Sequence, residues 1–171
     1  SAIRVKQSQH PPEFIDPIMG PLQESPEKQR EDFIVRRRDG LFAYQLAVVC
    51  DDIDQNISCV VRGADLLDST PKQLRLFQLL NQTAPEYLHI PLAVNQQGDK
   101  LSKQNYAPAI QPEQAQEQLF QALRFLGHCP PSEFKTESCE QTLSWAIKHW
   151  QRQSIPKTPT INIDSTRPES S

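Results

Sequence analysis

Short apolar runs, separated by polar turns, prolines and acidic residues, set the pattern of the first half of the chain. Residues 33–35 and 57–61 are rich in β-branched side chains and are bounded by turn residues, which predicts two strands. The second run is apolar on both faces except for Ser58, so it predicts a strand buried on both faces in the middle of a parallel sheet. Residues 46–50 fit a buried strand and a buried helix equally well.

A helix is predicted to begin at Thr70, whose hydroxyl is a suitable N-cap, with Pro71 at the first helical position and Gln73 completing a capping box. Its apolar face is predicted to comprise Leu74, Leu76, Phe77, Leu79 and Leu80. A strand over 87–92 follows, and strand, helix and strand together predict a β-α-β unit. The loop that opens at Gly98 follows this second strand.

Two amphipathic helices are predicted in the second half, over 113–126 and from Ser138 to Trp150. Gly127 is expected to end the first, and Ser138 with Gln141 to cap the second. Their apolar stripes are Ala115, Leu119, Ala122, Leu123 and Leu126, and then Cys139, Leu143, Ala146, Ile147 and Trp150. These stripes are interpreted as the core of a helical hairpin rather than as a groove for a partner. The segment after Ile155 is rich in Pro, Thr and Ser and is predicted to be disordered.

Chain length, net charge and the lengths of the apolar runs narrow the class of protein. A chain of 171 residues can bury one sizeable core, or one medium domain with a small satellite. A net charge of -3 argues against non-specific coating of nucleic acid, and the one dense basic run, at residues 36–38, is interpreted as a solvated face. No apolar run approaches the length of a membrane span and no export signal begins the chain, so a cytoplasmic protein is expected.

The four cysteines form no Cys-x-x-Cys pair and have no histidine at ligand spacing, which argues against a zinc knuckle and a disulfide framework. Reduced thiols are therefore expected. Three carboxylates at Asp51, Asp52 and Asp54 could bind a divalent cation, but they lack the glycine and the distal glutamate of a calcium loop. They are interpreted as a solvated turn that ends a helix, and no metal site is predicted.

Two features have the chemistry of anion binding. Lys100 and Lys103, with Ser102 between them, could neutralise the charge of a polyphosphate, or could form an ordinary basic turn. Arg62 follows the apolar run 57–61, and its fork of donors could hold a substrate carboxylate or form a salt bridge with Asp65 or Asp68. Taken alone, the two lysines favour the ordinary basic turn, whereas the two alternatives for Arg62 stay open.

The segment Lys100-Leu101-Ser102-Lys103-Gln104 resembles the signature loop of class I aminoacyl-tRNA synthetases, in the Lys-Leu-Ser-Lys form used by the glutamate enzymes. Blocks at residues 32–44, 60–67 and 69–73 match the same family in the same order. Over about residues 1–150 the chain resembles the glutamyl-Q tRNA(Asp) synthetases, the short relatives of glutamyl-tRNA synthetases. His89-Ile90-Pro91-Leu92 imitates the family's His-Ile-Gly-His motif, but it lies within a strand and has proline where the motif needs glycine.

The resemblance implies an α/β fold: the second half of a class I synthetase Rossmann-like parallel sheet, followed by a small α-helical domain. It implies that residues 1–40 end an inserted region and that 41–110 form the nucleotide-binding half with the lysine loop. Residues 111–155 would form the helical hairpin domain, and 156–171 a disordered tail. A helix is expected to begin near Tyr44.

The activity implied by the resemblance is ATP-dependent formation of glutamyl-adenylate, followed by transfer of the glutamyl group to queuosine of tRNA(Asp). Tyr44 and Arg62 match positions that hold L-glutamate. Lys103 matches the loop lysine that contacts ATP, and Lys100 and Ser102 assist it; ATP would be bound with Mg²⁺ as a substrate.

The same resemblance places the His-Ile-Gly-His equivalent and a cysteine-based zinc site before Ser1, in a first half that this chain lacks. The chain alone is then expected to be inactive, and the complete enzyme to be a monomer. Two alternatives remain: a fragment of an ordinary glutamyl-tRNA synthetase, and a non-catalytic module that binds RNA or a partner through the surface that the other half would cover.

Overall fold

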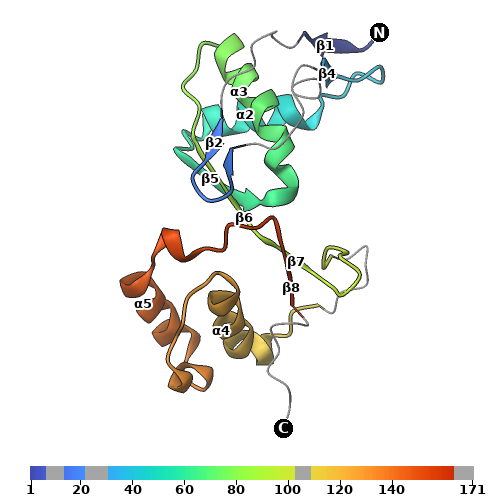
Figure 1. The fold of residues 1–171 in the computed structure, drawn as a ribbon. Coiled ribbons are helices and arrows are strands. Elements are labelled where there is room, and N and C mark those ends of the chain that lie inside the picture. Colours follow the sequence, from blue (N-terminus) through green and yellow to red (C-terminus); the bar gives the residue numbers. More distant parts are fainter. Residues whose placement is uncertain (7–13, 22–30, 103–108, 164–171) are drawn as a thin grey trace. The chain divides into compact units, whose positions relative to one another are not determined.

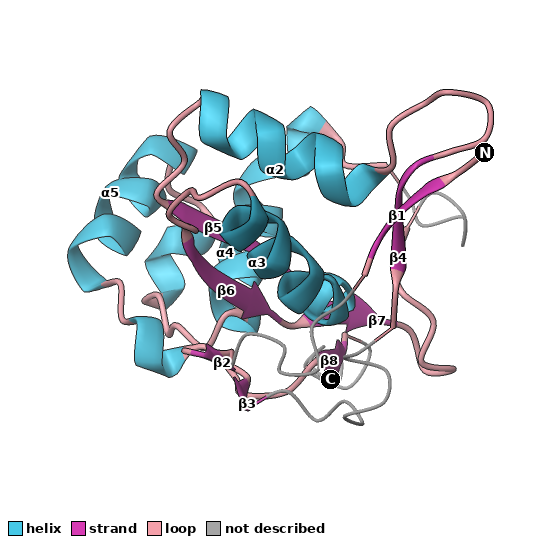
Figure 2. Ribbon diagram, turned by 90° about the horizontal axis from the view of Figure 1, so that it is seen from above, coloured by secondary structure: helices cyan, strands magenta, loops and turns pink. Residues whose placement is uncertain are grey.

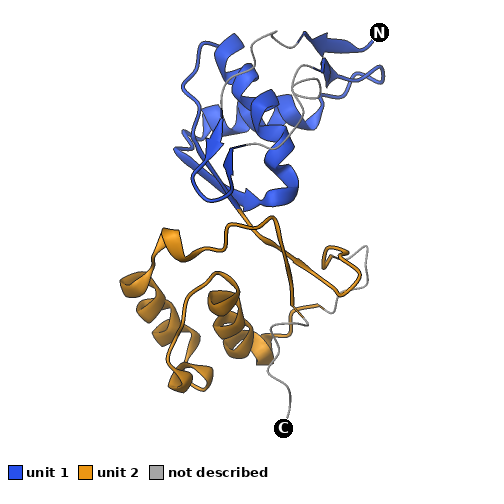
Figure 3. Ribbon diagram, viewed as in Figure 1, with its two compact units in different colours: residues 1–89 blue, residues 90–171 orange. Residues whose placement is uncertain are grey.

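The computed structural model describes residues 1–6, 14–21, 31–102 and 109–163. The chain divides into two compact units, Ser1–His89 and Ile90–Ser171 (Figure 3). Each unit has buried side chains of its own and is described separately.

Three strand pairs organise the first unit. β1 (Ile3–Val5) pairs antiparallel with β4 (Phe33–Arg36), and β2 (Ile15–Asp16) pairs antiparallel with β3 (Gly20–Pro21). β5 (Cys59–Gly63) pairs with β6 (Glu86–Ile90). Between them the chain passes through the 3₁₀ helix η1 (Ala64–Ser69) and helix α3 (Thr70–Leu79), so the predicted order of strand, helix and strand is confirmed.

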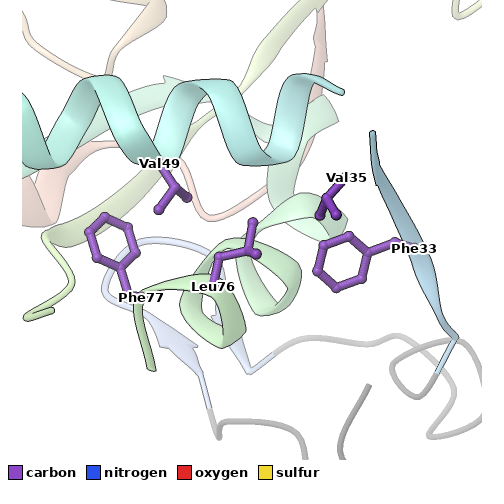
Figure 4. Close-up of a cluster of buried hydrophobic side chains, with 5 residues drawn as sticks. All are labelled: Phe33, Val35, Val49, Leu76 and Phe77. Atoms are coloured by element: carbon purple, nitrogen blue, oxygen red, sulfur yellow. The ribbon is translucent and has the colours of Figure 1, made fainter. Parts of the chain in front are cut away.

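Helices α2 (Tyr44–Asp54) and α3 lie side by side and enclose the core of this unit (Figures 1 and 2). Figure 4 shows Val49 of α2 directed toward the two core side chains of α3, with two side chains of β4 completing the cluster. The buried residues are Phe33, Val35, Val49, Leu76 and Phe77. The helix expected near Tyr44 is therefore present, and residues 46–50 belong to it rather than to a strand.

The expectation of a β5 strand buried on both faces is wrong. Cys59 is exposed and the Val61 side chain is 61% exposed. Within the described part of the chain β5 has one hydrogen-bonded neighbour, β6, so its other edge and much of its surface stay open. The strand also runs on to Gly63, which places Arg62 inside β5 rather than after it.

The capping box predicted at Thr70 is also wrong. Ser69 is the N-cap of α3, it makes no side-chain capping bond, and the Thr70 backbone N–H donates to the Leu67 carbonyl of η1. Because the preceding 3₁₀ turn satisfies this backbone group, the Thr70 hydroxyl is available for another partner. Leu79 and Leu80 of the expected apolar face are exposed, since α3 buries Thr70 and Gln73 beside Leu76 and Phe77.

The second unit combines a two-stranded sheet with two packed helices. β7 (Leu92–Val94) pairs in parallel with β8 (Thr160–Asn162), and α4 (Ala115–Phe125) packs against α5 (Cys139–His149) (Figure 1). The short 3₁₀ helices of this unit are η3 (Pro112–Gln114), η4 (Ser132–Lys135) and η5 (Arg152–Ser154). Of the segment expected to be disordered, residues 160–162 form β8. Backbone hydrogen bonds hold it, including Ile163 N to Val94 O at 3.1 Å, and they need no apolar side chains.

The helical hairpin is present, but its facing sides differ from the prediction. The Ser138–Gln141 capping box of α5 is confirmed. The buried residues of α5 are Thr142 and Ala146, whereas Ile147 is 79% exposed, and Leu143 and Trp150 are exposed as well. Gln116 of α4 donates through Nε2 to the Thr142 hydroxyl at 2.7 Å, so a polar contact selects the facing side, which a hydrophobicity pattern does not reveal.

Gly127 ends α4 in the left-handed region, with φ +81°, as the sequence predicts. A Cβ at this position would lie 2.0 Å from the Ser154 carbonyl oxygen of η5, so both the backbone conformation and the close packing exclude a side chain. We expect Gly127→Ala to lower the free energy of unfolding by more than about 1 kcal/mol. Urea titration followed by tryptophan fluorescence measures this, because Trp145 and Trp150 both lie in the second unit.

Gly98→Ala is the matched control. Gly98 also has a positive φ, +84°, but nothing lies within 4 Å of the Cβ that alanine would add. It should therefore show the cost of the backbone conformation without the steric clash. Equal losses in the two variants would contradict the role assigned to the contact with Ser154.

Candidate functional site

Arg62 of β5 is held by three elements of the first unit. Its Nε donates to Nε2 of His89 on β6 at 3.0 Å. Its Nη2 donates to the Thr70 hydroxyl at the start of α3, at 2.8 Å, and to the Leu66 carbonyl of η1 at 3.4 Å. These contacts do not use the two N–H groups on Nη1. Among the described residues, these contacts fix the guanidinium in position through two of its three nitrogens.

The imidazole of His89, which contacts Arg62, is itself held by a buried acid, Asp16. The Asp16 carboxylate is 2% exposed, and its Oδ2 lies 2.7 Å from His89 Nδ1 and accepts the His89 backbone N–H at 2.9 Å. Its Oδ1 accepts the backbone N–H groups of Ile18 and Met19, at 2.8 and 2.7 Å. The tight turn between β2 and β3 thus delivers one carboxylate to the imidazole that contacts Arg62.

The aromatic ring of Tyr87 covers one side of the Arg62 guanidinium. The Arg62 Cζ lies over the Tyr87 ring, 4.9 Å from its centroid, which is a favourable cation–π geometry. Burial raises the pKa of Tyr87 to about 12, although the Arg62 charge opposes this shift, so the phenol stays protonated at neutral pH. The Tyr87 hydroxyl is buried and has no hydrogen-bond partner among the described residues.

Tyr44 and Asp52, both on α2, also act on Arg62. Burial lowers the pKa of Arg62, while Tyr87, Tyr44 and Asp52 oppose this shift and Tyr44 is hydrogen-bonded to the guanidinium. Partial burial raises the pKa of Asp52, and the Arg62 charge lowers it. The two residues that the resemblance assigned to amino-acid binding, Tyr44 and Arg62, are therefore brought together, and the charge of Asp52 acts on the same guanidinium.

The position of Tyr44 follows from the local sequence. It is the first residue of α2, and its neighbour Gln45 donates to the Ser69 hydroxyl at 3.0 Å and accepts from Gln73 Nε2 at 2.8 Å. These bonds connect the start of α2 to the start of α3, beside Thr70 and its bond to Arg62. Tyr44 itself is 52% exposed, so its ring and hydroxyl can meet a ligand.

Chemically, this cluster is suited to a small anion. Arg62 is effectively always protonated, its Nη1 offers two N–H donors, and the Tyr44 hydroxyl adds a group that can donate or accept. Charge-assisted hydrogen bonds of this kind contribute about 1.5–3 kcal/mol each. A carboxylate suits such donors, since it accepts through two oxygens.

The lysine loop belongs to the second unit. Its first part is a tight turn in which Asn95 Oδ1 accepts the backbone N–H groups of Gln97 and Asp99, and Gly98 has a positive φ. Lys100 is exposed, and its backbone forms an isolated antiparallel β-bridge with Val94. Ser102 is half-buried. Lys103, to which the resemblance assigned the contact with ATP, lies outside the described residues.

The sequence alone does not predict most of the residues that hold Arg62. His89 stands in the segment that imitates the His-Ile-Gly-His motif, and its buried position in β6 agrees with rejecting that motif. Thr70 was assigned to a cap, and Asp52 to a solvated turn. Tyr87 carried no signal beyond its place in a strand. Asp16 carried none, because its partner lies 73 residues away in the sequence.

The described residues contain no group of three or more acidic, histidine or cysteine side chains that could hold a metal ion. The four cysteines are free thiols. No helix in the described ranges combines the length and apolar character needed to cross a membrane.

Residues 1–154 match the family described as tRNA synthetases class I (E and Q), catalytic domain. A glutamyl-Q tRNA(Asp) synthetase of Vibrio cholerae is 46% identical over 160 residues, which are 94% of this chain and 53% of that protein. The protein of the same name from Salmonella choleraesuis is 47% identical over 163 residues, 95% of this chain and 54% of the relative. The chain therefore spans about half the length of these curated relatives.

Two solved structures share the fold. The glutamate-tRNA synthetase of Elizabethkingia anophelis superposes with a TM-score of 0.62 at 19% identity, covering 96% of this chain and 35% of that one. A glutamate tRNA ligase of Elizabethkingia meningosepticum, solved in complex with its amino acid, gives a TM-score of 0.59 at 20% identity, covering 92% and 33%. The α/β fold class predicted from the sequence is thus confirmed. The chain belongs to the class I tRNA synthetase family of the glutamate and glutamine enzymes, a family of ligases, and its sequence is similar to that of the glutamyl-Q tRNA(Asp) synthetases.

Proposed function

We propose that this chain carries the glutamate pocket and the ATP loop of a glutamyl-Q tRNA(Asp) synthetase. Such an enzyme activates L-glutamate with ATP and transfers the glutamyl group to queuosine of tRNA(Asp). The observation that carries the proposal is the Arg62 guanidinium, which His89 and Thr70 hold through Nε and Nη2 and which is also hydrogen-bonded to Tyr44. The names of the relatives support the choice of glutamate and of this transfer RNA.

In the first step Arg62 and Tyr44 hold a carboxylate of glutamate. A guanidinium that is already positioned loses little freedom when the substrate binds, so more of the interaction energy appears as affinity. The same restraint orients the substrate for reaction, which is worth more than the contact energy alone.

In the second step an oxygen of the α-carboxylate of glutamate attacks the α-phosphorus of ATP. The bond from that phosphorus to the bridging oxygen breaks, and pyrophosphate leaves with the electron pair. Lys103 stabilises the negative charge that accumulates on the leaving oxygens, and Lys100 and Ser102 assist. The Mg²⁺ that accompanies ATP shares this charge. This charge-stabilising role of Lys103 is proposed from its place in the signature loop.

In the third step a nucleophilic group of queuosine attacks the activated carbonyl of glutamyl-adenylate. The bond to the phosphate oxygen breaks and AMP leaves. The chain spans about half the length of its relatives, so we propose that adenylate formation also needs the part of the relatives that this chain does not match. The open edge of β5, where Val61 is exposed, is a surface on which that part can pack.

The direct test compares this chain alone with a joined protein, in which the chain is linked to the unmatched part of the Vibrio cholerae relative. We expect glutamate-dependent exchange of pyrophosphate into ATP only in the joined protein, and glutamyl transfer to tRNA(Asp) that contains queuosine. Transfer to tRNA(Glu) instead would identify an ordinary glutamyl-tRNA synthetase. Binding of tRNA without exchange would indicate a non-catalytic module, and the absence of both would refute the proposal.

Lys103→Ala in the joined protein should lower kcat for pyrophosphate exchange by about 10²–10³-fold, the usual effect of removing one donor that stabilises transition-state charge. The KM for glutamate should change far less, because this lysine meets phosphate and not the amino acid. Lys100→Ala should have a smaller effect on kcat. Lys148→Ala, an exposed lysine on α5, is the control and should change neither parameter. Unchanged exchange kinetics in Lys103→Ala would contradict the assigned role.

Arg62→Lys keeps a positive charge but removes the fork of donors, so the KM for glutamate should rise at least about tenfold while the KM for ATP stays constant. Tyr44→Phe removes one exposed hydroxyl, and it should raise the KM for glutamate by a smaller factor without a loss of stability. Steady-state exchange at varied glutamate and varied ATP separates the two constants. Equal changes in both constants would argue against a pocket that is specific for the amino acid.

A further inference from the structure

His89 is enclosed within the first unit and does not face a substrate. Its side chain is 0% exposed, and the Phe14 ring packs against it edge-on at 6.2 Å. Asp16, Arg62 and Thr70 are its polar neighbours. A buried histidine in contact with one acid and one permanent cation has a choice of tautomer, and that choice decides what Arg62 meets.

The contacts favour one tautomer. Asp16 Oδ2 is an acceptor, so His89 Nδ1 carries a proton and donates to it at 2.7 Å. Arg62 Nε is a donor, so His89 Nε2 is unprotonated and accepts from it at 3.0 Å. The other tautomer would set a donor against a donor at Arg62 and a lone pair against the carboxylate of Asp16. Each buried polar group left unsatisfied in this way costs about 1–3 kcal/mol.

Asp16 is equally constrained. Three backbone N–H groups and one imidazole N–H are directed at its two oxygens, with distances between 2.7 and 2.9 Å. Such a carboxylate cannot rotate to serve another partner without leaving several donors unsatisfied. The orientation of the imidazole is therefore set by the turn between β2 and β3, on the opposite side of His89 from Arg62.

We propose that Asp16 and His89 are positioning residues for glutamate binding: Asp16 fixes the Nδ1–H tautomer of His89, and His89 Nε2 then holds Arg62 with its Nη1 donors directed to the substrate carboxylate. This inference rests on the proposed function and adds two residues that do not touch the substrate. Thr70, whose hydroxyl accepts from Nη2, holds the second nitrogen of the same fork.

The tautomer can be measured in this chain without any catalytic assay. We expect the ¹⁵N chemical shifts of the His89 ring to show a protonated Nδ1 and an unprotonated Nε2. The chain has four histidines, and the signal lost in His89→Gln identifies the correct one. A protonated Nε2, or rapid exchange between the two tautomers, would overturn the inference.

The kinetic test uses two substitutions of His89, one that keeps a group near Nδ1 for Asp16 and one that keeps a group near Nε2 for Arg62. In the joined protein, His89→Asn keeps an amide near the position of Nδ1, within reach of Asp16, but offers no acceptor to Arg62. His89→Gln places its amide oxygen near the position of Nε2, where it can accept from Arg62. We expect His89→Asn to raise the KM for glutamate at least about tenfold with little change in the KM for ATP, and His89→Gln to restore most of the affinity.

A purely structural role would give a different result, because loss of packing would impair both variants alike and would lower the melting temperature in step with activity. Equal KM values for glutamate in the two variants would therefore overturn the proposal. His149→Asn, an exposed histidine on α5, is the control and should leave the KM unchanged. If the unchanged joined protein shows no glutamate-dependent exchange, the proposed function fails, and the role in glutamate binding fails with it. The ring spectrum still decides whether Asp16 fixes the tautomer.

The same network predicts how stability depends on pH. Burial lowers the pKa of His89, the Arg62 charge lowers it further, and Asp16 and Asp65 oppose the shift. The unfolded chain takes up a proton at this residue below about pH 6.5, whereas the folded chain does not until a lower pH. The contribution of His89 to the free energy of unfolding is therefore complete above that pH and decreases as the pH falls through this window.

His89→Gln removes this dependence, so the difference in stability between the unchanged chain and the variant should be smaller at pH 5.5 than at pH 7.5. Urea titrations followed by circular dichroism measure it, since both tryptophans lie in the other unit. The remaining histidines cancel in the comparison. A difference that stays constant or grows in acid would show that His89 is not held neutral.

Discussion

The position of one guanidinium determines the rest of the site. Arg62 is partly buried, and a cation in such a place must find acceptors or remain poorly solvated. The first unit supplies them from separate elements: an imidazole from β6, a hydroxyl from the start of α3 and a carbonyl from η1. The face of Tyr87 covers one side of the group. These contacts with described residues do not use the two donors on Nη1, and Tyr44 at the start of α2 is hydrogen-bonded to the same guanidinium.

This arrangement explains why several local features depart from simple rules. The Thr70 hydroxyl does not cap its helix because Arg62 uses it, and the 3₁₀ turn before α3 satisfies the backbone instead. Gln73 is buried on the core side of α3 because its amide contacts Gln45, which follows Tyr44. Hydrogen bonds thus link Gln73 to Gln45 and Gln45 to Ser69, beside Thr70 and its bond to Arg62, while Gln73 Oε1 has no hydrogen-bond partner among the described residues.

The sequence predicted those features that depend on neighbours in the chain. The strands around Ile34 and Val60, the helix after Pro71, the stop at Gly127 and the cap at Ser138 follow from local pattern. The pairing of Tyr44 with Arg62 followed from resemblance. The rest depends on contacts between distant segments: Asp16 meets His89 across 73 residues, and Gln116 meets Thr142 across 26. No periodicity records such pairs, and for the same reason the exposure of Val61 and Ile147 was not foreseen.

Two kinds of residue take part in the proposed function. We propose that Asp16, His89, Arg62 and Tyr44 act on the amino acid, so substitutions there should change the KM for glutamate. We propose that Lys100, Ser102 and Lys103 act on the phosphates of ATP, so substitutions there should change kcat. This division is a consequence of chemistry, since a carboxylate that binds before reaction and a charge that develops during it need donors at different moments.

The most direct test of the central claim is a crystal structure of the joined protein with L-glutamate and a non-hydrolysable ATP analogue. The account predicts a glutamate carboxylate within hydrogen-bond distance of Arg62 Nη1 and the Tyr44 hydroxyl, with the Lys103 ammonium at the phosphates. Glutamate bound elsewhere, with Arg62 Nη1 directed at a protein group or with Lys103 remote from the phosphates, would contradict it.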